Sequence, residues 1–223
     1  MLLESFKIGA GFPLIVFDLD GTILNSLPAT FNALRAVISP RIGREVQIKD
    51  MVHLINNTDL EILREMAGVD DYQACLAEYL DHFRNHQDDL QPFPGVIELV
   101  EELGRNDVPV AILTGRARLS TDLLLELHGL KDLVKLVVAA DDGPARKPAP
   151  DGIFKIAKEL EVEFKGGLII GDGPADVKAG RAASLFTIAT RWCGLIPMEQ
   201  ITRVEPDYTV ETITELSALL SMG

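Results

Sequence analysis

Five short apolar runs divide this chain, and they constrain its fold more than any other feature. The runs cover residues 14–17, 108–113, 134–139, 168–170 and 185–189. They are largely continuous rather than alternating, as expected for strands that are covered on both faces of a parallel sheet. Segments with apolar residues at helical spacing lie between the later runs. We therefore predict an α/β fold with a doubly wound, mainly parallel, Rossmann-like sheet.

The helices expected around this sheet follow from the spacing of apolar residues between the runs. Asp151 is placed to cap one of them, and the residues that follow it repeat at helical spacing. The predicted core helices cover residues 96–103, 119–127, 151–160, 175–182 and 212–220.

One interval breaks the alternation of strands and helices. About ninety residues separate the first run from the second, far more than a single crossover needs. This interval contains no convincing strand, and Thr58 with Glu61 forms a capping-box pattern that opens a helix which Gly68 can close. The helical segments expected here cover residues 29–38, 58–68 and 72–83.

We interpret this interval as an all-helical cap subdomain inserted into the α/β core. The predicted cap covers residues 26–92, and the core covers residues 1–25 and 93–223. Residues 21–28 and 91–95 are rich in turn formers and would serve as the two hinges. A lid of this kind excludes water and admits small substrates rather than polymers.

Charge and composition exclude some classes of partner. The formal net charge is -13, which argues against a nucleic-acid partner because such proteins need clustered lysine and arginine. No apolar run approaches the ~20 residues that span a bilayer, the first residues do not resemble a secretory signal, and the two cysteines make no metal-type pair. We expect a cytoplasmic protein with no membrane partner.

Two carboxylates follow the first predicted strand. Asp18 and Asp20 alternate along an extended segment, so both can point to one side of it. Carboxylates held this close repel each other unless a cation lies between them, and oxygen ligands suit Mg²⁺. Gly21 then lets the backbone turn sharply. The alternative interpretation is a strand end with two solvated acids and a turn glycine.

The later strands also end in polar residues at the edge of the sheet where ligands bind in open α/β folds. Thr114 and Gly115 offer a hydroxyl and an amide that can hold a phosphoryl oxygen, and the proline-flanked Lys147 can neutralise phosphate charge. Asp172 and Asp176 can complete a metal site. Taken singly, these residues are equally compatible with a surface lysine and ordinary helix caps.

Together, these four strand-end elements resemble the motifs of the haloacid dehalogenase superfamily, in the branch with a helical cap, and the chain is similar to phosphoglycolate phosphatases. The resemblance covers residues 14–220. It implies a magnesium-dependent phosphatase that hydrolyses a small-molecule phosphate monoester through an aspartyl-phosphate intermediate. Its partner would be a small phosphorylated metabolite, whose identity stays open.

The resemblance also implies a role for each motif residue. Asp18 would be the nucleophile and a metal ligand, and Asp20 would be the general acid and base while lending its backbone carbonyl to Mg²⁺. Asp172 would bind the metal directly, and Asp176 would support the metal ligands or the lysine. The spacing of Asp18 and Asp20 favours phosphatases, because dehalogenase members lack the second aspartate.

Phosphate binding falls to a second set of residues by the same resemblance. Thr114 and Lys147 would contact the phosphoryl group during catalysis, with Gly115 and the nucleophile Asp18 beside it. Two alternatives stay open: a phosphomutase of the β-phosphoglucomutase type, and a catalytically silent phosphate-binding module. The oligomeric state, monomer or homodimer, also stays open.

Two residues depart from the family pattern or fall outside it. Asn25 stands where many helical-cap relatives have aspartate, which puts substrate specificity by analogy in doubt. Arg116 follows Thr114 and Gly115, and its side chain either faces the substrate or is solvated; we favour the solvated position.

Several polar or aromatic residues near the predicted site are given structural rather than catalytic roles. His53 and Asn56 lie in the cap, where a histidine is more often a surface or core residue than a substrate ligand. Asn57 is expected to help the next helix begin. Trp192 and Cys193 follow the last predicted core strand and are expected to pack.

Overall fold

Parallel strands form the centre of the computed structural model, which describes residues 12–51, 57–68, 71–143 and 145–220. All neighbouring strands pair in parallel, in the order β3-β2-β1-β4-β5-β6. The predicted doubly wound α/β fold is confirmed. The strands are β1 (Ile15–Phe17), β2 (Val110–Leu113), β3 (Leu136–Val138), β4 (Leu168–Gly171), β5 (Phe186–Thr190) and β6 (Tyr208–Val210).

The last strand, β6, is missing from the sequence prediction. It has three residues, and only Val210 is buried, so it lacks the apolar run that marks the other strands. The carboxylate of Asp207, just before β6, accepts hydrogen bonds from the backbone N and the hydroxyl of Thr187 in β5, both at 2.8 Å. Pairing with β5 and this side-chain contact place the edge strand, and neither is visible in a local pattern.

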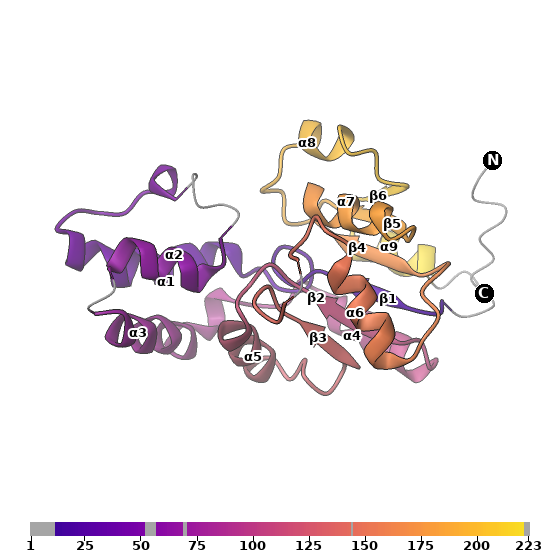
Figure 1. Cartoon of the computed structure of the whole chain (residues 1–223), viewed down its shortest axis with the longest axis horizontal. Coiled ribbons are helices and arrows are strands. Elements are labelled where there is room, and N and C mark those ends of the chain that lie inside the picture. The colour runs from indigo at the N-terminus through magenta and orange to yellow at the C-terminus, as the bar shows by residue number, and fades with distance from the viewer. Residues whose placement is uncertain (1–11, 52–56, 69–70, 144, 221–223) are drawn as a thin grey trace.

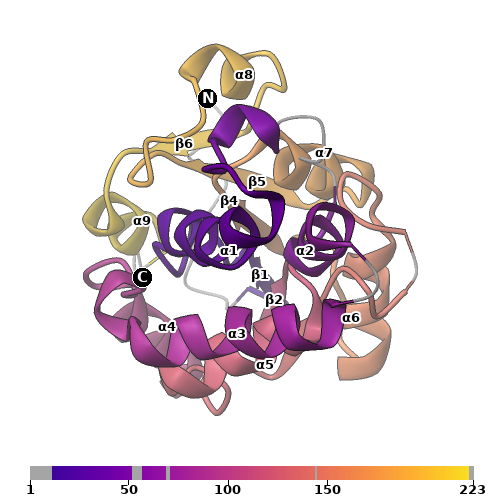
Figure 2. The same ribbon diagram turned by 90° about the vertical axis from the view of Figure 1, so that its left-hand side faces the viewer.

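The sheet separates two hydrophobic layers because alternate residues of β1 point to opposite faces. Ile15 and Phe17 pack in one layer, whereas Leu14 and Val16 pack in the other. The first layer also contains residues of α4 (Val96–Arg105), α5 (Arg118–Leu127) and α9 (Ile213–Leu220). The second contains residues of α6 (Asp151–Leu160) and α7 (Pro174–Ala182). The short helix α8 (Met198–Thr202) lies beyond β5, at the top of Figure 2.

Among the described residues, three α-helices form the cap. They are α1 (Leu27–Ile42), α2 (Asp59–Ala67) and α3 (Tyr72–Asn85), which pack on one another. Figure 1 shows them as a group set to one side of the sheet. Two 3-10 turns, η2 (Ile48–Asp50) and η4 (Gln87–Asp89), belong to the same region. An inserted helical cap is therefore present, while its boundaries at residues 26 and 92 remain a prediction.

Local capping signals in the cap are confirmed in part. Thr58 caps α2 and forms a capping box with Glu61, and Gly68 follows the last turn. Asn57 does not cap the helix, because Thr58 occupies that position; the Asn57 side chain instead donates to Glu65 at 3.4 Å.

The order of the strands determines where the site lies. The chain runs from β1 outward through β2 to β3, and then returns to β4 on the other side of β1. In open α/β sheets, such a reversal opens a crevice at the carboxyl ends of the strands. The residues just after β2 reach the cap helix α2, so the cap faces this crevice.

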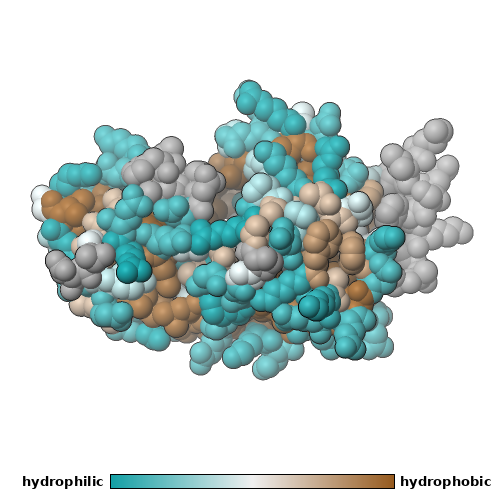
Figure 3. All heavy atoms as spheres, in the orientation of Figure 1, coloured by the Kyte–Doolittle hydropathy of each residue, from teal (hydrophilic) through white to brown (hydrophobic). Residues whose placement is uncertain are grey.

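Hydrophilic residues cover most of the face in Figure 3, with smaller apolar areas between them. Within the described ranges, no helix has both the length and the hydrophobicity needed to cross a membrane.

The packing of α7 on the sheet predicts a steric effect on stability. A Cβ atom at Gly180 would lie 2.2 Å from Ile169 Cγ2 and 2.7 Å from Thr187 Cγ2. We predict that Gly180→Ala lowers the free energy of unfolding by about 1–3 kcal/mol through overpacking. Urea denaturation measures the change.

Gly104 in α4 supplies the matched control, because a Cβ there would have nothing within 4 Å. Gly104→Ala should raise the free energy of unfolding by roughly 0.5–1 kcal/mol through helix propensity. Equal stability changes for the two variants would contradict the packing described for α7.

Candidate active site

Asp18 lies at the end of β1, held between the strands on either side. Its backbone N donates to the carbonyl of Ile170 in β4 at 2.8 Å, and its side chain is buried. Lys147 Nζ donates to Asp18 Oδ1 at 2.6 Å. Burial, with the nearby charges of Asp176 and Asp20, raises the pKa of Asp18 to about 7, although Lys147 opposes the shift.

Lys147 is a buried cation with two anionic partners. Its side chain is 8% exposed, and Nζ also donates to Asp176 Oδ1 at 2.5 Å. Burial by itself would lower the lysine pKa, but Asp176 and Asp18 outweigh it and raise that pKa. Lys147 therefore carries its positive charge at the centre of the acidic cluster.

Asp172 and Asp176 reach the same place from β4 and α7. Asp176 lies in the first turn of α7, where its Oδ2 accepts from the backbone N of Gly173 at 3.1 Å. Asp172 follows the strand directly. Burial, followed by the charge of Asp18, raises the pKa of Asp172 to about 8. Asp176 thus acts both as a helix cap and as a partner of Lys147.

Gly21 makes room for Asp172. A Cβ at Gly21 would lie 2.2 Å from Asp172 Oδ2, and the residue has φ of 82°. Both the close approach and the left-handed backbone favour glycine. The turn after Asp20 is therefore shaped to fit the carboxylate delivered by β4.

One oxygen from each of Asp18, Asp172 and Asp176 lies within 4.8 Å of the other two, a grouping that can hold a metal ion. Asp172 Oδ2 is buried and has no hydrogen-bond partner in the described residues. Buried carboxylate oxygens without partners are costly, and a divalent cation satisfies them. The donor set is all oxygen, as Mg²⁺ prefers.

The Asp20 side chain turns away from this group. It accepts from Arg116 Nη2 at 2.7 Å and from Arg116 Nε at 3.1 Å, and Ser26 Oγ also donates to it. Burial would raise the pKa of Asp20, but the Arg116 charge and these hydrogen bonds hold it below its usual value. These contacts favour the ionised form of Asp20.

Arg116 corrects the expectation from the sequence that its side chain is solvated. The side chain is 2% exposed and forms ion pairs with Asp20 and with Asp59 of the cap. Arg116 lies just beyond a predicted strand, and no local pattern in the sequence shows that a cap helix covers this position. Three sequence segments, far apart along the chain, create this buried environment.

Thr114 and Gly115 occupy the predicted edge of the sheet after β2. Thr114 is buried, and its backbone N donates to the carbonyl of Val138 at 3.0 Å. Its hydroxyl accepts from the backbone N of Arg116 at 3.2 Å. Gly115 is exposed, and a Cβ there would meet nothing within 4 Å, so the backbone is open on this side.

Trp192 and Cys193 lie just after the end of β5, and Asn25 lies after the end of β1. Trp192 Nε1 donates to the carbonyl of Thr22 at 3.0 Å and its ring packs beside Phe93, as expected. Cys193 is half-buried, and burial followed by Asp172 raises the pKa of its thiol. The backbone N of Asn25 donates to the carbonyl of Gln91 at 3.0 Å, which joins the two predicted hinges.

His53 and Asn56 lie outside the described residues. Ser26 and Asp59 were not singled out as site residues, although both contact groups of the site. In the sequence, Asp59 stands only as a residue between Thr58 and Glu61 of the capping-box pattern. No pattern relates positions 20, 59 and 116, because their contact depends on the docking of the cap.

The chain is similar in sequence to several proteins named pyrophosphatase. Pyrophosphatase PpaX of Listeria monocytogenes is 26% identical over 92% of this chain and 95% of its own length. Pyrophosphatase PpaX of Bacillus cereus is 24% identical, over 93% of this chain and 95% of its own length.

Solved structures share the fold along nearly the whole chain. The crystal structure of a predicted phosphoglycolate phosphatase from Haemophilus somnus has a TM-score of 0.78 at 20% identity, covering 95% of this chain and 97% of its own. A predicted phosphatase from Clostridium acetobutylicum has a TM-score of 0.71 at 19% identity, covering 93% and 97%.

A family model provides the decisive comparison. The model of the haloacid dehalogenase-like hydrolases matches residues 15–190, which run from β1 through β5. This stretch includes every motif residue from Asp18 to Asp176. With the strand order and the strand-end carboxylates described above, the match shows that this chain belongs to the haloacid dehalogenase-like hydrolase family.

Proposed function

We propose that this hydrolase is a magnesium-dependent phosphatase that cleaves a small phosphate monoester through an aspartyl-phosphate intermediate on Asp18. The observation that carries the proposal is the buried contact of Lys147 with Asp18 and Asp176, at 2.6 and 2.5 Å, beside Asp172. A cation fixed against a buried carboxylate prepares the site for an anionic substrate. The names of the relatives, pyrophosphatase and phosphatase, agree with this class of reaction.

The acidic cluster fits a divalent cation. Asp18 and Asp172 would hold it with one carboxylate oxygen each, and the backbone carbonyl of Asp20 is the further ligand that the family resemblance implies. Asp176 stays with Lys147 and supports both. When bound, Mg²⁺ would offset charge on the phosphoryl oxygens and on the clustered carboxylates.

The first half of the reaction transfers the phosphoryl group to the protein. A carboxylate oxygen of Asp18 attacks phosphorus, the bond from phosphorus to the ester oxygen breaks, and the leaving oxygen takes a proton from Asp20. Lys147 offsets charge beside the attacking carboxylate, and the hydroxyl of Thr114 with the amide of Gly115 would hold a phosphoryl oxygen. The products are an alcohol and the acyl phosphate on Asp18.

The second half restores the protein. Water attacks the phosphorus of the acyl phosphate, Asp20 takes a proton from that water, and the bond to Asp18 breaks to release inorganic phosphate. Asp20 ends protonated and Asp18 ends ionised, as each began. The lowered pKa of Asp20 favours its ionised form, which is the form required to accept the proton from water.

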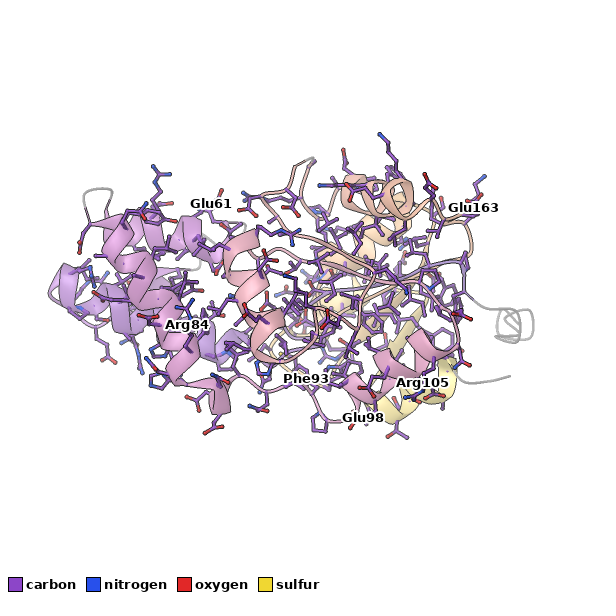
Figure 4. All side chains as sticks on the ribbon, turned by 90° about the horizontal axis from the view of Figure 1, so that it is seen from below. Glu61, Arg84, Phe93, Glu98, Arg105 and Glu163 are labelled. Carbon is purple, nitrogen blue, oxygen red and sulfur yellow. The ribbon has the colours of Figure 1, made fainter. Side chains whose placement is uncertain are left out.

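The cap supports a small substrate. It faces the strand ends and is joined to them by the ion pairs of Arg116 with Asp59 and of Arg146 with Glu61. Figure 4 shows Glu61 on the side of the cap that faces the core. A docked lid excludes polymers, so a small phosphorylated metabolite such as phosphoglycolate is the substrate class that we favour.

The nucleophile provides the most direct test. Asp18→Asn should lower phosphate release by roughly a thousandfold or more, because an amide is a poor nucleophile. Malachite-green detection over a panel of small phosphate esters measures it. Asp132→Asn is the control, since Asp132 is exposed and precedes β3, at the opposite end of the sheet from the site.

Turnover that survives in Asp18→Asn would overturn the covalent mechanism. Conversion of a sugar phosphate to its isomer without release of phosphate would identify a phosphomutase instead. Absence of turnover with every ester in the panel would favour a phosphate-binding module without activity.

The raised pKa values predict how metal binding depends on pH. Folded, metal-free protein holds protons at Asp18 and Asp172 more tightly than the unfolded chain does, because their pKa values rise to about 7 and about 8. The contribution of these two groups to the free energy of unfolding therefore falls as the pH rises from about 4 to about 8. A divalent cation displaces the protons and relieves the repulsion, so its affinity should increase over the same range.

The increase in thermal unfolding temperature caused by Mg²⁺ should thus be larger at about pH 8 than at about pH 6. Differential scanning fluorimetry without substrate measures it. Asp172→Asn should abolish most of the shift, whereas Asp132→Asn should keep it. An equal shift at both pH values would show that these carboxylates do not bind the ion.

A further inference from the structure

A single guanidinium joins the cap to the site. Arg116 lies just after β2 in the core, yet its side chain contacts all three cap helices. Nη2 donates to Thr30 Oγ1 of α1 at 2.6 Å and Nη1 donates to Asp59 Oδ2 of α2 at 3.1 Å. The guanidinium carbon also lies 5.7 Å from the centre of the Phe83 ring in α3. The position of the cap is therefore transmitted to one core side chain.

The same guanidinium holds the carboxylate of Asp20. Nε lies 3.1 Å from both carboxylate oxygens, and Nη2 donates to Oδ1 at 2.7 Å. Two donors in one rigid plane fix the orientation of a carboxylate, which a single ammonium cannot do. Ser26 at the start of α1 adds its hydroxyl, so Asp20 is held from the cap side by two groups.

Asp59 fixes the cap end of this connection. Its Oδ1 accepts from the backbone N of Ala117 at 3.1 Å, and its Oδ2 accepts from the Tyr79 hydroxyl at 2.8 Å. The side chains of Arg116 and Asp59 are 2% and 4% exposed. A buried, hydrogen-bonded network of this kind is rigid, and breaking one member affects the others.

We propose that Arg116 is a positioning residue that couples the docking of the cap to the orientation of Asp20. The inference rests on the proposed function, in which Asp20 exchanges the proton with the leaving group and with water. When α1, α2 and α3 close over the strand ends, their contacts place the guanidinium, and the guanidinium places the carboxylate. Proton transfer is thereby tied to a closed cap.

A second ion pair between cap and core allows a matched control. Arg146 donates to both oxygens of Glu61 at 2.7 Å. Glu61 lies on the same helix as Asp59, but this pair is half-exposed, with 35% and 45% of the side chains accessible, and it does not include Asp20. Glu61→Gln therefore weakens cap docking without disturbing the carboxylate of Asp20, and glutamine preserves the capping box.

The test compares leaving groups. p-Nitrophenyl phosphate has a leaving group that needs little protonation, whereas an alkyl phosphate turned over by the wild type depends on the general acid. kcat and KM are measured for both esters with wild type, Asp20→Asn, Arg116→Lys, Asp59→Asn and Glu61→Gln. The decisive quantity is the ratio of kcat/KM for the alkyl ester to that for the aryl ester.

Arg116→Lys and Asp59→Asn should lower this ratio by about 10- to 100-fold, in the direction of Asp20→Asn, because a misplaced general acid costs most where protonation matters. The loss should fall mainly on kcat. Glu61→Gln should change both esters by the same factor and leave the ratio at the wild-type value.

A uniform loss for both esters in Arg116→Lys and Asp59→Asn would show a merely structural role and overturn the inference. Loss of a buried ion-pair member can unfold the protein, so Tyr79→Phe, which removes one hydrogen bond to Asp59 but no charged side chain, is measured as well. It should lower the ratio by a smaller factor, and an unchanged ratio in this folded variant would also overturn the inference.

The proposed function fails in a distinguishable way. If Asp20→Asn lowers both esters equally, Asp20 is not the general acid, and the inference falls with that role. If Asp18→Asn retains turnover, the covalent mechanism is wrong whatever the ratio shows.

Discussion

The buried contact between Lys147 and the carboxylates of Asp18 and Asp176 is the constraint on which the rest of the site depends. Carboxylates this close, in a place from which water is largely excluded, repel each other strongly. One fixed ammonium offsets part of that repulsion, and Asp172 still has an unsatisfied oxygen. The site is thus built to accept more positive charge, which is the physical argument for a divalent cation.

The fold makes this concentration of charge possible. β1, β2 and β4 are adjacent and parallel, so the residues that follow them converge on one edge of the sheet. Apolar layers on both faces keep the strands in place, and Gly21 gives the space that the carboxylate of Asp172 requires. Burial of the acidic side chains is unfavourable, and hydrophobic packing on the two faces of the sheet offsets this free energy.

The helical cap also supplies contacts to a side chain of the core. Through Thr30, Asp59 and Phe83 it surrounds Arg116, which in turn holds Asp20. The two cations of the site thus have different partners: Lys147 faces the nucleophile, and Arg116 faces the residue proposed to transfer protons. A chain with a net charge of -13 thus keeps two buried cations at the strand ends, where they can offset the charge of the proposed anionic substrate.

The α/β fold, the inserted helical cap and the strand-end residues could be predicted from the sequence, because continuous apolar runs, helical spacing and capping signals are local. The strand β6 could not, because it has three residues and only Val210 is buried. The burial of Arg116, the turn of Asp20 toward it, and the contacts of Asp59 and Ser26 with these residues follow only from the folded structure. These contacts join residues that lie far apart along the chain, and they exist only when the cap is docked on the sheet.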